Sequence, residues 1–94
     1  MIIAVDFDGA LEINGKPNTA LIAMLRQRQQ QGCAVILWTC RHGKSLNEAV
    51  RFCMQHGLRF NAVNQNLPQI VNRFGYDPCK IFADIYIDDK AAKP

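Results

Sequence analysis

Four short runs of apolar residues recur along the chain, separated by longer segments whose apolar residues follow helical spacing. The runs are Ile2–Val5, Ala34–Trp38, Phe60–Val63 and Ile81–Ile87. A continuous apolar run without polar alternation is typical of a strand in a parallel sheet that helices cover on both faces. The alternation of strands and helices therefore predicts an α/β fold, a three-layer, Rossmann-like parallel sheet flanked by helices and joined by right-handed crossovers.

Two helices are predicted from their capping residues and from one apolar face each. The first starts at Asn18, a favourable N-cap, and runs up to Gly32. The second opens at a Ser-x-x-Glu capping box, formed by Ser45 and Glu48, and ends at Gly57. The apolar faces contain Leu21, Met24 and Leu25 in the first helix, and Leu46, Ala49, Val50 and Cys53 in the second.

Turn residues predict the smaller elements. Asn14-Gly15 is the strongest short signal for a β-hairpin, so a small flap is expected at about residues 10–17. Pro68 opens a brief helical turn. A chain of 94 residues with no linker and no internal repeat is expected to form a single domain over residues 1–94.

The composition is that of an ordinary globular domain. Hydrophobic residues make up 49% of the chain, charged residues 20%, and the formal net charge is +3. The basic residues are scattered, which gives no signature of direct nucleic-acid binding. No apolar run approaches the ~20 residues that span a bilayer, and the N-terminus lacks a cleavable signal pattern. We therefore expect a cytoplasmic protein with no membrane partner.

The four cysteines contain no Cys-x-x-Cys pair, so we expect reduced thiols. Cys40, His42, Cys53 and His56 faintly resemble a set of zinc ligands. Their spacing follows neither a finger nor a knuckle pattern, and Cys53 fits the buried face of the second helix. A zinc site is therefore the weaker interpretation.

Two pairs of carboxylates follow predicted strands at opposite ends of the sequence. Asp6 and Asp8 come after the first strand and precede Gly9, and Asp88 and Asp89 come after the last. Asp followed by Gly is also common turn chemistry, so the first pair alone decides nothing. If the strand ends meet, however, four carboxylates must either take up protons or hold a cation. Oxygen ligands of this kind favour Mg²⁺, which in turn binds phosphate.

Further polar groups at the strand ends suit a phosphate ligand. Thr39 closes the second strand, and a lysine would supply the ammonium group that, with a hydroxyl and a metal, clamps a phosphoryl group. Asp-x-Asp-Gly after the first strand, Thr39, a lysine and the paired Asp after the last strand together resemble the haloacid dehalogenase (HAD) superfamily of phosphohydrolases. The resemblance extends over nearly the whole chain.

The resemblance implies a role for each carboxylate. Asp6 would be the nucleophile that forms an aspartyl-phosphate, and Asp8 would protonate the leaving oxygen and later activate water. Thr39 would bind a phosphoryl oxygen. The Mg²⁺ ligands would come from Asp6, Asp8 (through its backbone carbonyl) and Asp88, with Asp89 nearby.

The basic residues of the expected site are less sharply defined. Lys80, which precedes the last strand as the family's motif lysine often does, is preferred as the catalytic lysine over Lys44, which lies shortly after Thr39 at a helix start. Arg41 would bind the substrate or its phosphate in a bidentate manner. The alternative interpretation is that Arg41 is a surface residue of the loop with no role at the site.

Several features depart from the family pattern. Ala10 stands where the family usually has Thr or Ser, which leaves reduced activity as an open question. The segments between strands are too short for an inserted lid, so the resemblance is to a small member without a cap domain. The short segment after Asp89 suggests a bare sheet edge, and a bare edge invites pairing with a second copy of the chain, a homo-oligomer.

The expected function is thus a Mg²⁺-dependent phosphatase that acts through an aspartyl-phosphate on a phosphorylated small molecule or macromolecule. The alternative is a catalytically weak or inactive HAD-fold module that binds phosphate or a partner. A phosphoacceptor similar to a response-regulator receiver is disfavoured, because the third strand ends in Asn64 where a receiver carries Asp. The sequence does not identify the substrate.

Overall fold

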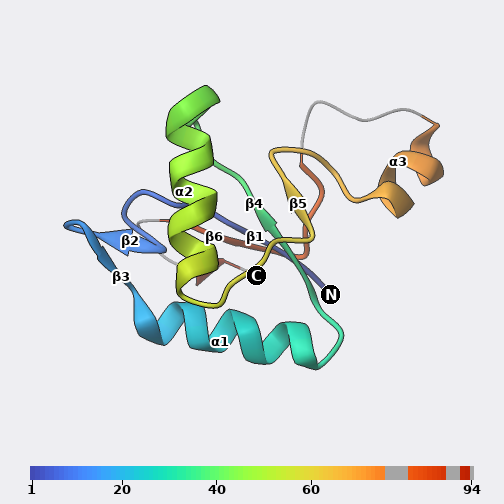
Figure 1. Cartoon of the computed structure of the whole chain (residues 1–94). Coiled ribbons are helices and arrows are strands. Elements are labelled where there is room, and N and C mark those ends of the chain that lie inside the picture. The colour runs from blue at the N-terminus through green and yellow to red at the C-terminus, as the bar shows by residue number, and fades with distance from the viewer. Residues whose placement is uncertain (76–80, 89–91, 94) are drawn as a thin grey trace.

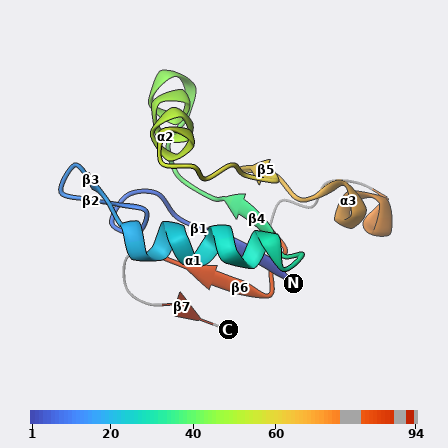
Figure 2. The ribbon, with the colours of Figure 1, turned by 60° about the horizontal axis from the view of Figure 1, so that its bottom comes forward.

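The computed structural model describes residues 1–75, 81–88 and 92–93 of the chain. Its main sheet has the strand order β5-β4-β1-β6-β7. The strands are β1 (Ile2–Val5), β4 (Ala34–Leu37), β5 (Ala62–Val63), β6 (Ile85–Ile87) and β7 (Ala92–Lys93). The first four strands in this order are parallel, and β7 pairs antiparallel with β6 (Figure 2). The predicted parallel α/β sheet is therefore confirmed.

Strand β1 is the central strand, and all four of its residues are buried. Its neighbours are β4 on one side and β6 on the other, so both of its edges are hydrogen-bonded. Successive residues point to opposite faces of a sheet. Ile3 and Val5 accordingly belong to one apolar cluster, whereas Ile2 and Ala4 belong to another. This arrangement explains why the strand reads as a continuous apolar run.

Helices α1 (Thr19–Gln30) and α2 (Gly43–Gln55) both pack against the first of these faces. Their buried residues are Ile22 and Leu25 in α1 and Ala49 and Cys53 in α2, and all four join the cluster that contains Val5. Helix α3 (Pro68–Phe74) contributes Ile70 to the cluster on the opposite face. It lies to one side of the sheet, beyond β5 (Figure 1). Helices therefore flank the sheet on both faces.

The predicted flap and the first helix cap are confirmed. Strands β2 (Glu12–Ile13) and β3 (Lys16–Pro17) form an antiparallel pair, and both residues of the Asn14-Gly15 turn have positive φ, 53° and 79°. This is the backbone that a two-residue hairpin requires. The Asn18 side chain accepts a hydrogen bond from the Leu21 amide, and its own amide donates to the Ala10 carbonyl at 3.0 Å. Asn18 thus ties the flap to α1.

The predicted capping box of the second helix is wrong. Helix α2 begins at Gly43, ahead of Ser45, and its N-cap His42 forms no side-chain cap bond. The helix starts early because the His42 carbonyl already accepts from the Leu46 amide. The Ser45 hydroxyl donates to that same carbonyl at 2.9 Å, so it does not accept from a helix N–H as a capping box requires.

The last strand is shorter than the apolar run that predicted it. Only Ile85–Ile87 are in β6, because the chain just before them is held by side chains: the Tyr86 hydroxyl accepts from the Ala83 amide and donates to the Ile81 carbonyl. The expected bare edge beside this strand is also wrong. Strand β7 pairs with β6 there and is the edge strand of the described sheet, and pairing with a second copy of the chain stays a prediction.

No helix in the described part of the chain is both long enough and apolar enough to span a bilayer.

Candidate functional site

A cavity of about 370 Å³ opens at the carboxyl ends of β1, β4 and β6. Ligands of parallel sheets bind at these ends, next to the strand where the order of connections reverses. Here the chain passes from β1 to β4 and β5 on one side and then returns to β6 on the other. The reversal therefore lies beside β1. The residues that line the cavity are Asp6, Trp38, Thr39, Cys40, Tyr86, Ile87 and Asp88.

The strand register explains why three of these residues meet. Val5 is level with Leu37 of β4 and with Ile87 of β6. The next residues along the three strands, Asp6, Trp38 and Asp88, therefore lie in one row. Because they are one residue beyond Val5, their side chains leave the sheet on the face opposite to α1 and α2. Two carboxylates from distant parts of the sequence thus reach the same cavity.

The backbone around Asp6 is held by hydrogen bonds that continue the sheet. The Asp6 amide donates to the Ile87 carbonyl at 2.9 Å, and the Trp38 amide donates to the Val5 carbonyl at 2.9 Å. One carboxylate oxygen of Asp6 accepts from the Phe7 amide at 2.7 Å. This bond fixes the rotamer of a half-buried carboxylate at the cavity wall.

Thr39 also lines the cavity, and its role in binding a phosphoryl oxygen stays a prediction. Its amide donates to Oδ1 of Asn64 at 2.8 Å, and its hydroxyl accepts from the Arg41 amide at 3.2 Å. Asn64 was expected only to exclude a receiver-like site. It follows β5 with a left-handed φ of 52°, a conformation that Asn tolerates better than most residues, and so reaches across to hold the loop after β4.

Asp8 and Arg41 form an ion pair, and neither is among the described residues that line the cavity. The guanidinium donates to both carboxylate oxygens, from Nε at 2.9 Å and from Nη2 at 2.8 Å. It also lies over the Phe7 ring, 4.7 Å from the centroid, and donates to the Ser45 carbonyl at 3.3 Å. Hydrogen bonding to Arg41 lowers the pKa of Asp8. Arg41 thus forms a bidentate pair with Asp8, and its predicted contact with the substrate or its phosphate stays a prediction.

The loop that carries Asp8 is fixed without a hydroxyl at position 10. The Gly9 amide donates to the Glu12 carbonyl at 2.8 Å, and the amides of Ala10 and Glu12 both donate to the Phe7 carbonyl. Gly9 has a φ of 78°, the conformation that favours glycine at this turn. Ala10 itself is buried. Backbone bonds therefore provide the order that a Thr or Ser side chain would supply.

The structure bears on only one of the two lysines that were considered for binding phosphate. Lys44 is exposed in the first turn of α2 and is not among the described residues that line the cavity. Lys80 and Asp89 lie outside the described residues. The preferred assignment of Lys80 as the catalytic lysine therefore stays a prediction.

The donor set at the cavity suits a hard cation. Asp6 and Asp88 contribute two carboxylates to the lining of the cavity, and the Asp8 carboxylate is paired with Arg41. Among the described residues, no group of three or more His, Cys, Asp or Glu side chains could hold a metal ion. Carboxylate oxygens such as those of Asp6 and Asp88 are the ligands that Mg²⁺ takes beside several waters and phosphate oxygens. Asp8, whose backbone carbonyl is predicted as a third ligand, is not among the described residues that line the cavity.

The weaker zinc interpretation finds no support in this geometry. Cys53 is fully buried in the apolar cluster beneath α2, whereas Cys40 is exposed at the cavity. Burial raises the pKa of the Cys53 thiol to about 11, which opposes the thiolate that a zinc ligand requires.

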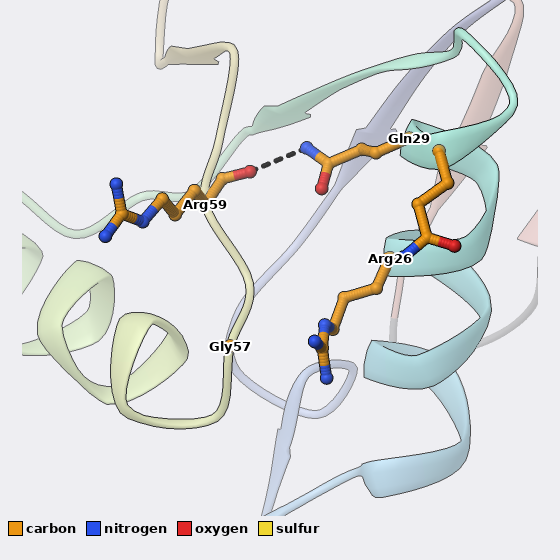
Figure 3. Close-up of a pocket in the computed structure, with 5 residues that line it drawn as sticks. Arg26, Gln29, Gly57 and Arg59 are labelled. Atoms are coloured by element: carbon orange, nitrogen blue, oxygen red, sulfur yellow. Dashed lines mark hydrogen bonds between the residues drawn. The ribbon is translucent and has the colours of Figure 1, made fainter.

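A second cavity, of about 340 Å³, lies beside α1 and the segment that leads to β5. It is lined by Arg26, Gln29, Gln30, Gly57 and Arg59 (Figure 3). The Gln29 amide donates to the Arg59 carbonyl at 2.6 Å and holds the two segments together. The guanidinium of Arg59 points away from Arg26, so the two do not form a clamp. The described residues that line this cavity include no carboxylate and no hydroxyl, unlike those of the first cavity.

Neither a protein-family model nor a curated protein matches the chain. A solved structure of a conserved protein coded by a locus from Bacteroides thetaiotaomicron matches it with a TM-score of 0.81 and 37% sequence identity. The match covers 96% of this chain and 76% of the other. The chain belongs to the family of that conserved protein.

Proposed function

We propose that the chain is a Mg²⁺-dependent phosphatase with a HAD-like core and no cap domain, which acts on a phosphomonoester through an aspartyl-phosphate. One observation carries the proposal: neighbouring parallel strands deliver Asp6 and Asp88 to one cavity at the reversal of the sheet, where Thr39 adds a hydroxyl. Two carboxylates beside a hydroxyl are the groups that position a phosphoryl group and its metal.

In this proposal Asp6 attacks phosphorus. The bond from the Phe7 amide to one carboxylate oxygen orients this side chain at the cavity wall, from which the carboxylate would act as the nucleophile. The side chains of Asp6 and Asp88 and the carbonyl of Asp8 would hold Mg²⁺, which when bound neutralises the phosphate and lets an anionic nucleophile approach. The Thr39 hydroxyl would donate to a phosphoryl oxygen, since its own contact in the structure is one that it accepts.

Asp8 would transfer protons in both half-reactions. Its pairing with Arg41 favours the ionised carboxylate, which suits activation of the water that hydrolyses the aspartyl-phosphate. Protonation of the leaving group requires the neutral acid, so in that step the Asp8–Arg41 pair has to open. The exposed position of Asp8, whose side chain is 55% accessible, permits this movement.

The test is turnover of p-nitrophenyl phosphate by the purified chain with added MgCl2 and, separately, with EDTA. Wild type should release p-nitrophenol only with Mg²⁺, and Asp6→Asn should lose at least about 10³-fold in kcat because no nucleophile replaces the carboxylate. Glu48→Gln, the same chemical change on the exposed part of α2, is the matched control and should keep wild-type activity.

Equal release by wild type and Asp6→Asn would refute the enzyme proposal. The alternative, an inactive module that binds phosphate, predicts a different pattern: no turnover by either protein, with Mg²⁺-dependent binding of inorganic phosphate that Thr39→Val weakens. Cytoplasmic location and action on a macromolecular substrate stay predictions from the sequence.

A further inference from the structure

Trp38 is the single tryptophan of the chain, and 48% of it is exposed. It directly follows β4, lies level with Asp6, and forms part of the wall of the same cavity. A tryptophan presents a large apolar surface that soluble proteins mostly cover. An aromatic ring left half open beside two carboxylates suggests that a ligand covers it.

The aromatic wall is held in place before any ligand arrives. The Tyr86 ring meets Trp38 edge to face, with centroids 5.7 Å apart and planes at 65°. The Tyr86 hydroxyl is fixed by the Ala83 amide at 3.1 Å and the Ile81 carbonyl at 2.5 Å. The Trp38 backbone is fixed by Val5. Pre-ordered aromatic surfaces lose little conformational freedom on binding, which favours affinity.

We propose that the cavity binds a small phosphate monoester whose organic part is a planar ring, with the ring against Trp38 and the phosphate at Asp6 and Asp88. This inference rests on the proposed function for its phosphate end. A nucleoside monophosphate and an aryl phosphate share the required chemistry. Stacking of one base on an aromatic side chain corresponds to roughly a 5- to 150-fold gain in affinity, and aliphatic sugar phosphates lack it.

The experiment compares 5′-AMP with ribose 5-phosphate, which share the phosphate and the sugar and differ by the adenine ring. Hydrolysis is prevented by using Asp6→Asn, and binding with MgCl2 present is followed by the fluorescence of Trp38, the only tryptophan. AMP should quench this fluorescence and bind at least about 5-fold more tightly than ribose 5-phosphate. Equal affinities, or binding of AMP without a change in fluorescence, would overturn the inference.

Substitutions of Trp38 test whether the planar ring of the ligand lies against this side chain. In calorimetric titrations Trp38→Phe should keep the preference for AMP, whereas Trp38→Leu should reduce the ratio of affinities to about one, because only the former retains a π-face. Arg26→Gln alters the second cavity (Figure 3) and should leave the affinity for AMP unchanged. If Arg26→Gln abolishes AMP binding instead, the ligand occupies that cavity and the inference is wrong.

Turnover measurements separate the two proposals. If wild type hydrolyses AMP and ribose 5-phosphate with equal kcat/KM, the ring preference fails while the phosphatase stands. If AMP binds at Trp38 with the expected preference but neither compound is hydrolysed, the phosphatase fails while the ring site stands. A kcat/KM for AMP at least about 5-fold higher, lost in Trp38→Leu, supports both.

Discussion

At the scale of single residues, the best-defined contact of the site is the pair of Arg41 and Asp8. Each carboxylate oxygen accepts one guanidinium hydrogen bond, and the guanidinium lies over the face of the Phe7 ring. This geometry is more specific than that of a loose surface pair. It assigns Arg41 a structural partner in the protein, in addition to the predicted role at the substrate.

Replacing Arg41 by Gln should raise the pKa of Asp8 toward its ordinary value, because the bond that favours the carboxylate is lost. A folded pKa below the unfolded one stabilises the protein above the unfolded value, and this contribution disappears as pH falls through the folded value. Wild type should therefore lose stability relative to Arg41→Gln on acidification. As Asp8 is mostly exposed, the difference should be only about 0.2–1 kcal/mol.

The carboxyl resonance of Asp8, followed by NMR titration in both proteins, measures the first effect directly. Urea unfolding near pH 7 and near pH 3 measures the second. Identical Asp8 titration curves in wild type and variant would show that the pair does not persist in solution.

Two cysteines should differ sharply in reactivity. Cys53 is buried with a pKa of about 11, whereas Cys40 is exposed at the cavity. At pH 8 only about one Cys53 thiol in a thousand would be ionised, and the core shields it further. Iodoacetamide should modify Cys40 in the native protein and Cys53 only after unfolding, as read by peptide mass spectrometry. Modification of both at similar rates would contradict the packing of α2.

The sequence was informative about residues that follow strands and uninformative about what those residues contact. Asp6, Thr39 and Asp88 could be predicted at the cavity because an apolar run directly precedes each of them. The spacing of residues in the sequence did not indicate that Arg41 would pair with Asp8, because that contact depends on how α2 packs beside the loop that follows β1. Trp38 was read as the end of a strand, although its exposure now makes it the most informative wall residue.

At the scale of elements, the loop after β4 depends on the end of β5. Asn64 accepts from the Thr39 amide, and its own amide lies 3.4 Å from the Arg41 carbonyl. A side chain at the end of a neighbouring strand thus determines where Thr39 and Arg41 lie. The sequence predicted each element separately, but a contact between two loops belongs to the tertiary structure.

Variants of Asn64 separate its conformation from its hydrogen bonds. Asn64→Gly keeps the left-handed φ and loses the side chain, so the Thr39 amide should exchange hydrogen about 5-fold faster, the effect of one ordinary hydrogen bond. Asn64→Asp retains the accepting oxygen and should protect Thr39 as well as wild type does. Hydrogen exchange of that amide is the measurement. Faster exchange in both variants would mean that the accepted bond alone does not hold the loop and that the contact of the Asn64 amide with the Arg41 carbonyl, which Asp cannot form, is needed as well.

The errors at this scale have physical causes. The Ser-x-x-Glu pattern was present, but α2 begins at Gly43, so Ser45 already lies inside the helix. Strand β7 was missed because two residues carry too little periodicity to be recognised. The parallel strands and α1 were predictable because continuous apolar runs, an N-cap and terminal glycines all indicated the same structure.

At the scale of the whole molecule, the site couples to stability because its carboxylates come from opposite ends of the chain. Asp6 and Asp88 approach only when β1 and β6 pair, so unfolding separates them. Without a cation, two neighbouring negative charges oppose this pairing. A cation that binds the folded chain alone should reverse the effect, since ligand binding to the native state adds stability by mass action.

We therefore expect opposite effects of Asp88→Asn in the two conditions. In EDTA the variant should melt at the same temperature as wild type or higher, because one of two like charges is gone. In MgCl2 at ten times its dissociation constant, wild type should gain about 1.4 kcal/mol, or roughly 6–11 °C for a domain of this size, and the variant much less. Calorimetric scans of wild type, Asp88→Asn and the control Glu48→Gln in EDTA and in MgCl2 test this reversal in the order of melting temperatures. A gain shared by all three proteins would mean that Mg²⁺ acts elsewhere, and equal melting of wild type in both conditions would show that the folded carboxylates hold no cation.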